Sequence, residues 1–240
     1  MQPPAGFDAT GGEHFYNNVP DQRYIVHVGH QVTDLAGAPV LMYIPGTGSE
    51  AVSLDNNPFI VNLIMVIVRA SPPRPSRSKA NYHASTPVWV MHLALACRAG
   101  GGRKCSGMGF SRGGFWLTQM AGMENNLFES IALIGSYCQP SQSALEQQRI
   151  AGALLHTKVI AYVLLNDESC LWREYSAFFN ELIGMKKTVY LRLVPTLSHE
   201  QLPPLMVDGN MSHKLLRNVE GCLYKVAIKG ADLRQEMGWF

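Results

Sequence analysis

The sequence predicts an α/β protein in which helices cover both faces of a mostly parallel central sheet. Segments typical of strands alternate with segments typical of helices along most of the chain, and this alternation is characteristic of parallel sheets. Residues 59–68 (FIVNLIMVIV) form a continuous apolar run rich in Ile and Val, as in strands that are buried on both faces. The composition, 47% hydrophobic and 16% charged over 240 residues, allows a large core to form.

The first half of the chain contains three predicted strands before its first helix. Residues 24–29 alternate between apolar and polar side chains, residues 39–48 read as a strand that ends in a glycine-rich turn, and residues 59–68 form the buried strand. Residues 71–79 (SPPRPSRSK) hold several prolines and therefore predict an exposed loop, because proline breaks helices and central strands. The following residues, 88–98, predict a helix.

The second half continues the alternation. The sequence predicts strands over 104–110, 130–138, 158–165 and 187–194, and helices over 112–123, 169–185 and 211–223. There is no internal repeat. We expect residues 1–20 to be a flexible N-terminal segment and residues 21–240 to form a single domain.

Composition also excludes several classes of function. A formal net charge of +2 is too balanced for a nucleic-acid-binding surface. The N-terminal residues have no apolar core of a signal peptide, and the run over 59–68 is too short for a transmembrane helix, which needs about 20 residues. The five cysteines are widely spaced and odd in number, which favours a reducing compartment; we therefore expect a cytoplasmic protein.

The stretch GFSRGG, residues 109–114, contains the candidate nucleophile. It fits the pattern G-x-S-x-G, with Ser111 between Gly109 and Gly113. A strand precedes it and a helix follows, as this motif requires: the serine occupies a strained turn that raises its hydroxyl above the sheet. The glycines are needed because side chains at their positions would collide in so sharp a turn.

A serine hydroxyl needs a general base to become a nucleophile, and the base needs a carboxylate to orient it. His199 follows the strand predicted over 187–194, and Asp167 follows the strand predicted over 158–165. Glu168 is the obvious rival to Asp167. Because ligands bind at the carboxyl ends of parallel strands, we expect Ser111, Asp167 and His199 to form a triad, in the chain order Ser, Asp, His.

The turn after an early strand supplies candidate donors for an oxyanion hole. Gly46 and Thr47 lie in YIPGTGS, and their backbone N–H groups are sterically accessible. The second donor would be the N–H of Arg112, the residue after the nucleophile.

These residues together resemble α/β-hydrolases of the phospholipase/carboxylesterase and acyl-protein thioesterase type. GFSRGG is similar to that group's G-F-S-x-G-G. Asp167 lies 56 residues after Ser111 and His199 lies 32 residues after Asp167, similar to the group's compact members. The chain differs in the early turn, where Pro45-Gly46 replaces the usual His-Gly. The resemblance implies a serine esterase that acts through an acyl-enzyme on a small-molecule or acyl ester, without metal or cofactor.

Two alternatives stay open. Gly107, Gly109 and Gly113 give G-x-G-x-x-x-G between a strand and a helix, close to the fingerprint of dinucleotide-binding proteins. The second alternative is a protein with the hydrolase fold that binds a small molecule or partner without catalysis, because a fold alone does not determine function.

Overall fold

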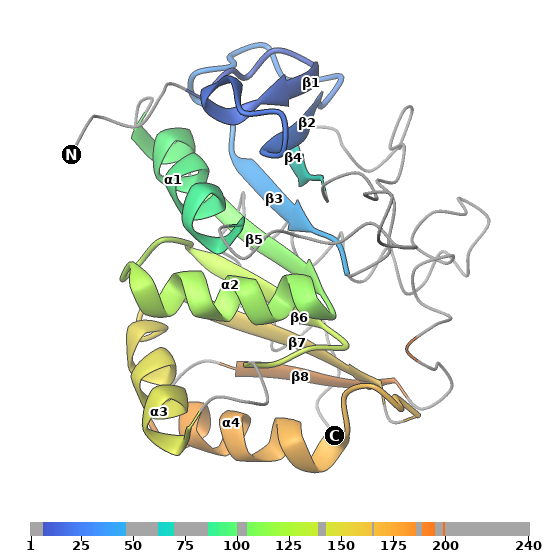
Figure 1. Cartoon of the computed structure of the whole chain (residues 1–240), viewed down its shortest axis with the longest axis vertical. Helices are drawn as coiled ribbons and strands as arrows, with labels where there is room; N and C mark the ends of the chain where they lie inside the picture. Colours follow the sequence, from blue (N-terminus) through green and yellow to red (C-terminus); the bar gives the residue numbers. More distant parts are fainter. Residues whose placement is uncertain are drawn as a thin grey trace.

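The computed structural model describes residues 7–46, 62–69, 86–99, 105–138, 143–164, 166–185, 189–194 and 199. Within these residues eight strands form one sheet, accompanied by four helices and a short 3-10 turn, η1 (Tyr16–Asn18) (Figure 1). The strands are β1 (Gly12–Phe15), β2 (Arg23–Val28), β3 (Val40–Ile44), β4 (Ile64–Val68), β5 (Cys105–Phe110), β6 (Ser130–Ile134), β7 (Lys158–Leu164) and β8 (Val189–Val194). The helices are α1 (Thr86–Ala99), α2 (Arg112–Met123), α3 (Ala144–Ala153) and α4 (Trp172–Gly184).

The sheet is mostly parallel, as predicted. Its strand order is β1-β2-β4-β3-β5-β6-β7-β8. The pairs from β4 to β8 are all parallel, whereas β2 pairs with both of its neighbours in the antiparallel direction. The carboxyl ends of β5, β6, β7 and β8 therefore meet at one edge of the sheet.

The described helices line one face of this sheet. From β5 to β8 the order along the chain and the order in space coincide, so right-handed crossovers place α2, α3 and α4 on the same face. The crossover from β4 over β3 to β5 runs in the same direction and adds α1 to this layer. In agreement, each helix contacts the next one along the chain, and Figure 1 shows α2 lying across β5 and β6.

Side chains on both faces of the central strands are buried. In β3, Val40, Met42 and Ile44 point towards the helix layer and belong to its apolar core. Leu41 and Tyr43 point to the opposite face and are also buried. The central sheet is therefore covered on both faces, which explains why β3 and β4 carry apolar side chains at every position.

Besides η1, two elements lie where no regular structure was predicted. β1 falls within residues 1–20, the segment treated above as flexible, and it pairs with β2 at the edge of the sheet. Its residues, GEHF, are mostly exposed, so no apolar alternation marks it. Helix α3 has only two buried residues, Ile150 and Ala151, so its sequence lacks a strong apolar stripe.

Two predicted strands are shorter than expected. β4 begins at Ile64 rather than at residue 59, and residues 62–63 form a bend. β6 ends at Ile134 rather than at residue 138, because Gly135 has a φ of 50° and turns the chain out of the sheet. The loop over 71–79 and the helix over 211–223 lie outside the described residues.

Two further expectations concern composition. In the described part of the chain, no helix combines the length and the apolar character needed to cross a bilayer. Four cysteines there, Cys97, Cys105, Cys138 and Cys170, are buried and form no disulfide.

Candidate active site

Ser111 occupies a strained turn between β5 and α2. Its φ of 52° and ψ of −123° lie in a region that non-glycine residues rarely adopt. Backbone hydrogen bonds hold this conformation: the Ser111 N–H donates to the Ile134 carbonyl at 3.0 Å, and the Ser111 carbonyl accepts from the Gly114 N–H at 3.0 Å. The hydroxyl thus stands at the carboxyl end of β5, as the G-x-S-x-G pattern predicts.

The flanking glycines permit this turn because backbone approaches them closely. A Cβ atom on Gly109 would lie 2.5 Å from the Gly114 nitrogen, and one on Gly113 would collide with the Ile44 carbonyl oxygen. Gly107, the third glycine of the dinucleotide-like pattern, faces the Leu117 side chain of α2. Each of the three glycines therefore has a packing reason within this fold.

Asp167 is the carboxylate that faces the site. Its side chain is completely buried, and its Oδ1 atom accepts hydrogen bonds from the backbone N–H groups of Ser169 and Cys170, both at 2.8 Å. These two bonds fix the carboxylate so that Oδ2 points to His199. Its sequence rival, Glu168, is exposed.

His199 joins the carboxylate to the serine. Its Nδ1 atom lies 2.7 Å from Asp167 Oδ2, and its Nε2 atom lies 2.8 Å from Ser111 Oγ. Because an ionised carboxylate only accepts hydrogen bonds, Nδ1 carries the proton and donates it, which leaves Nε2 to accept from the serine hydroxyl. The ring is 13% exposed and packs at 4.9 Å between centroids against Phe110.

Gly135, which sequence analysis did not single out, leaves space for the Asp167–His199–Ser111 hydrogen bonds. Ser111 follows β5 and Asp167 follows β7, so β6 runs between them and the side chains must meet above its end. A Cβ on Gly135 would lie 3.2 Å from Asp167 Oδ2 and 3.5 Å from His199 Nδ1. In the sequence Gly135 lies inside the strand predicted over 130–138, so no sequence signal marked it as part of the site.

Ser136 is a second residue that sequence analysis missed. It is fully buried, and its hydroxyl donates to the Ser111 carbonyl at 2.7 Å. Gly114 allows this contact, because a Cβ there would collide with the Ser136 hydroxyl. Ser136 thus links the end of β6 to the turn that carries Ser111.

The candidate oxyanion donors are only partly described. Gly46 lies directly against Ser111: a Cβ on Gly46 would lie 3.2 Å from the Ser111 Cβ and 2.8 Å from the Phe110 ring. Arg112 begins α2, so its backbone lies at the positive end of that helix's dipole, while its side chain is exposed. Thr47 lies outside the described residues.

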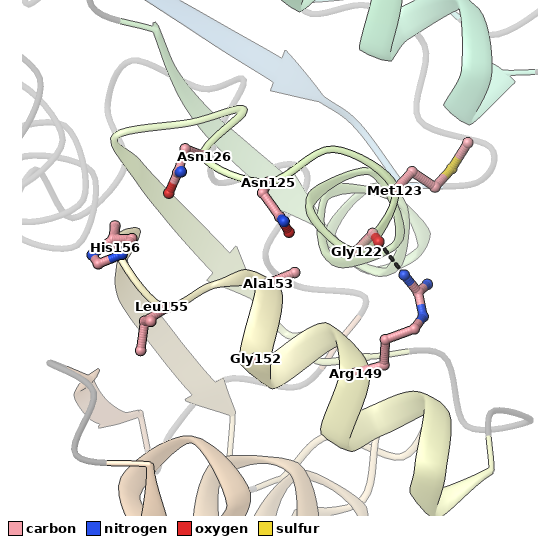
Figure 2. Close-up of a pocket in the computed structure, with 9 residues that line it drawn as sticks. All are labelled: Gly122, Met123, Asn125, Asn126, Arg149, Gly152, Ala153, Leu155 and His156. Atoms are coloured by element: carbon pink, nitrogen blue, oxygen red, sulfur yellow. Dashed lines mark hydrogen bonds between the residues drawn. The ribbon is translucent and has the colours of Figure 1, made fainter.

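A separate surface pocket, of about 500 Å³, lies near the amino-terminal ends of β6 and β7. It is lined by the last turns of α2 and α3 and by the segments that lead into β6 and β7, including Asn125 and His156 (Figure 2). Within it, the Arg149 guanidinium donates to the Gly122 carbonyl, as the dashed line marks. Because β5, β6 and β7 are parallel, this pocket is remote from Ser111, which follows the opposite ends of the strands.

Comparison with known proteins reveals a likeness of structure alone. No protein-family model and no curated protein sequence matches the chain. Among solved structures, a putative dienelactone hydrolase from Klebsiella pneumoniae superposes with a TM-score of 0.64 at 12% identity, covering 88% of this chain and 93% of that one. A carboxylesterase from Lactobacillus plantarum superposes with a TM-score of 0.63 at 11% identity, covering 92% and 98%.

A larger protein is similar over part of its length. The match to dipeptidyl peptidase 4 from Porphyromonas gingivalis has a TM-score of 0.63 at 12% identity and covers 85% of this chain, but this chain spans only 33% of that one. At such low identities the likeness establishes the fold. The chain has the α/β-hydrolase fold.

Proposed function

We propose that this protein is a serine hydrolase that cleaves a carboxylic ester or thioester through an acyl-enzyme. The observation that carries the proposal is the continuous set of hydrogen bonds from Ser111 Oγ through His199 to Asp167, with lengths of 2.8 and 2.7 Å. Three groups that are far apart in sequence meet in the order and geometry that nucleophilic catalysis needs.

In the first half of the reaction, Ser111 Oγ attacks the carbonyl carbon of the substrate while His199 Nε2 accepts the hydroxyl proton. Asp167 stabilises the imidazolium that forms, and its two backbone hydrogen bonds keep it aimed at Nδ1. His199 then gives the proton to the leaving alcohol or thiol, and the acyl group stays on Ser111. A water molecule, deprotonated by the same nitrogen, then attacks the acyl carbon; the bond to Ser111 Oγ breaks, His199 returns the proton to Oγ, and the acid is released.

The negative charge that develops on the substrate's carbonyl oxygen needs hydrogen-bond donors beside that oxygen. The backbone N–H groups of Arg112, at the start of α2, and of Gly46 or Thr47, in the turn after β3, are proposed for this role. The close approach of Gly46 to Ser111 supports it. This scheme uses protein groups, substrate and water only.

The test is hydrolysis of nitrophenyl esters of increasing acyl length, together with labelling by a fluorophosphonate probe. Ser111→Ala removes the nucleophile, so we expect loss of labelling and a fall in kcat of about 10⁴-fold or more. Asp167→Asn is expected to lower kcat by about 10³- to 10⁴-fold, because the amide no longer favours the required tautomer. The matched control is Glu168→Gln, which changes the neighbouring exposed carboxylate and should leave kcat unchanged.

The remaining outcomes separate the alternatives. Folded wild-type protein that is neither labelled nor active would overturn the proposal and favour a binding protein without catalysis. Tight binding of a nicotinamide or flavin cofactor, measured by fluorescence titration, would instead favour the dinucleotide alternative. Equal losses in Asp167→Asn and Glu168→Gln would remove Asp167 from its proposed role.

A further inference from the structure

A thiol lies beside the Asp167–His199 pair, and the proposed reaction gives it no part. Cys170 follows Asp167 by three residues and is 2% exposed. Its backbone N–H donates to Asp167 Oδ1 at 2.8 Å, which holds the residue against the carboxylate. One ligand atom each from Asp167, Cys170 and His199 lies within 4.8 Å of the other two.

The three donors form a set that suits zinc. A cysteine sulfur, an imidazole nitrogen and a carboxylate oxygen are the ligand types of Zn²⁺, and the thiolate selects against Mg²⁺ and Ca²⁺, which prefer oxygen. Electrostatics also favour the ion. A thiolate and a carboxylate together balance its double charge, so a neutral assembly replaces the buried carboxylate's single charge.

The geometry is close to what coordination requires. Around a tetrahedral zinc ion, with bonds of about 2.0–2.3 Å, ligand atoms lie roughly 3.3–3.7 Å from one another. In the structure His199 Nδ1 and Asp167 Oδ2 are 2.7 Å apart, and the widest separation in the set is at most 4.8 Å. Shifts of about 1 Å therefore bring all three atoms to bonding distance. We propose that Asp167, Cys170 and His199 form an inhibitory zinc site.

Zinc binding and catalysis exclude each other at His199. Coordination of Zn²⁺ by Nδ1 displaces the Nδ1 proton to solvent, and Nε2 takes up a proton from solvent, so the ring stays neutral. Cys170 gives up its thiol proton, and binding releases one proton in total. Nε2 then donates to Ser111 Oγ instead of accepting from it, and the serine has no base. This regulatory consequence rests on the proposed serine hydrolase function, whereas zinc binding itself does not.

The experiment compares wild-type protein with Cys170→Ala and with a matched control, Cys97→Ala, which removes a buried thiol in α1. Zinc affinity is measured by competition with a chromophoric chelator, in a buffer without thiol reductants. Ester hydrolysis is measured in zinc-buffered solutions, and each rate is divided by that variant's own rate without zinc. We expect Cys170→Ala to bind zinc at least about tenfold more weakly than wild type, with the half-inhibiting zinc concentration raised in proportion. Cys97→Ala should match wild type in both readouts.

Several results would overturn the zinc site: wild-type protein that binds no zinc, equal affinity in wild type and Cys170→Ala, or an equal loss in Cys97→Ala. Cys170→Ser, which keeps the side-chain volume, replaces Cys170→Ala if circular dichroism shows the latter unfolded. The two proposals fail separately. Hydrolysis that zinc does not inhibit refutes the site and spares the function, whereas Cys170-dependent zinc binding without any hydrolysis keeps the site and refutes the function.

Discussion

At the scale of single residues, the position of Ser111 depends on hydroxyl and backbone contacts that contribute little to the core. Ser136 is the clearest case, because its buried hydroxyl donates to the carbonyl of Ser111 itself. That carbonyl also accepts from the N–H groups of Gly114 and Phe115, at 3.0 and 3.3 Å. Removal of the Ser136 hydroxyl would therefore loosen the turn without leaving its acceptor unpaired.

Ser136→Ala is expected to destabilise the fold by about 1 kcal/mol, the usual net value of one hydrogen bond. It should also lower kcat by about tenfold, because small displacements of a reacting group are costly. Urea unfolding and ester hydrolysis measure the two effects. Thr157→Val is the matched control: the Thr157 hydroxyl donates to the Phe128 carbonyl at 2.9 Å, at the other edge of the sheet, so the variant should lose stability and keep its kcat. An unchanged kcat in Ser136→Ala would show that the contact has no positioning role.

At the scale of elements, α3 illustrates how a helix with few buried side chains is specified at its end. The Ser143 hydroxyl accepts from the Glu146 N–H at 3.2 Å, and Glu146 also pairs with Arg149 one turn later. The sequence SALE at residues 143–146 has the S-x-x-E spacing of a capping box. This local signal would have predicted the start of α3, which the apolar pattern did not reveal.

Ser143→Ala should destabilise the protein by about 1 kcal/mol, because a helix N–H loses its partner. Thermal or urea unfolding measures the change. Glu146→Gln is the comparison variant, since glutamine keeps the spacing of a capping box while it removes the exposed ion pair, and its loss of stability should be smaller. A larger loss in Glu146→Gln than in Ser143→Ala would assign the helix start to the ion pair instead.

At the scale of the whole molecule, burial inside the layered fold makes several acidic groups difficult to ionise. Burial raises the pKa of the Cys105 thiol from its ordinary value near 9 to about 12, and it raises the pKa of Cys138 to about 12. The pKa of Tyr24 also rises to about 12, mainly through burial. The folded protein thus holds these protons at pH values where the unfolded chain releases them.

Stability should therefore fall in alkaline solution. Above about pH 9 the unfolded thiols lose their protons while the native ones keep theirs, so the unfolded state binds fewer protons and the free energy of unfolding decreases as pH rises. The decline continues until the native groups titrate near pH 12, at up to about 1.4 kcal/mol per pH unit for each group. Urea unfolding between pH 8 and pH 11 measures the slope. Cys105→Ala removes one such group and should give a shallower slope; a slope equal to that of wild type would contradict the prediction for this thiol.

The sequence by itself determined the elements whose side-chain pattern reflects their burial or their backbone conformation. Continuous apolar runs identified β3, β4 and β7. The G-x-S-x-G pattern identified the turn at Ser111, because a close approach of backbone to backbone tolerates only glycine. It also ordered the candidate triad, since catalytic groups follow parallel strands at one edge of a sheet. Elements that contact little of the core, such as β1, have no apolar pattern from which the sequence could predict them.

Only the tertiary structure decided which groups meet. The sequence favoured Asp167 but left its neighbour Glu168 as a rival. The structure places Asp167 beside His199, with its Oδ1 held by two N–H donors and its Oδ2 directed to the imidazole. Gly135 and Ser136 contact the site only because β6 lies between β5 and β7, which brings residues distant along the chain together above the end of β6. The physical reason is that a side chain's chemistry is local, whereas its partners are set by strand order and by crossovers that no short stretch of sequence contains.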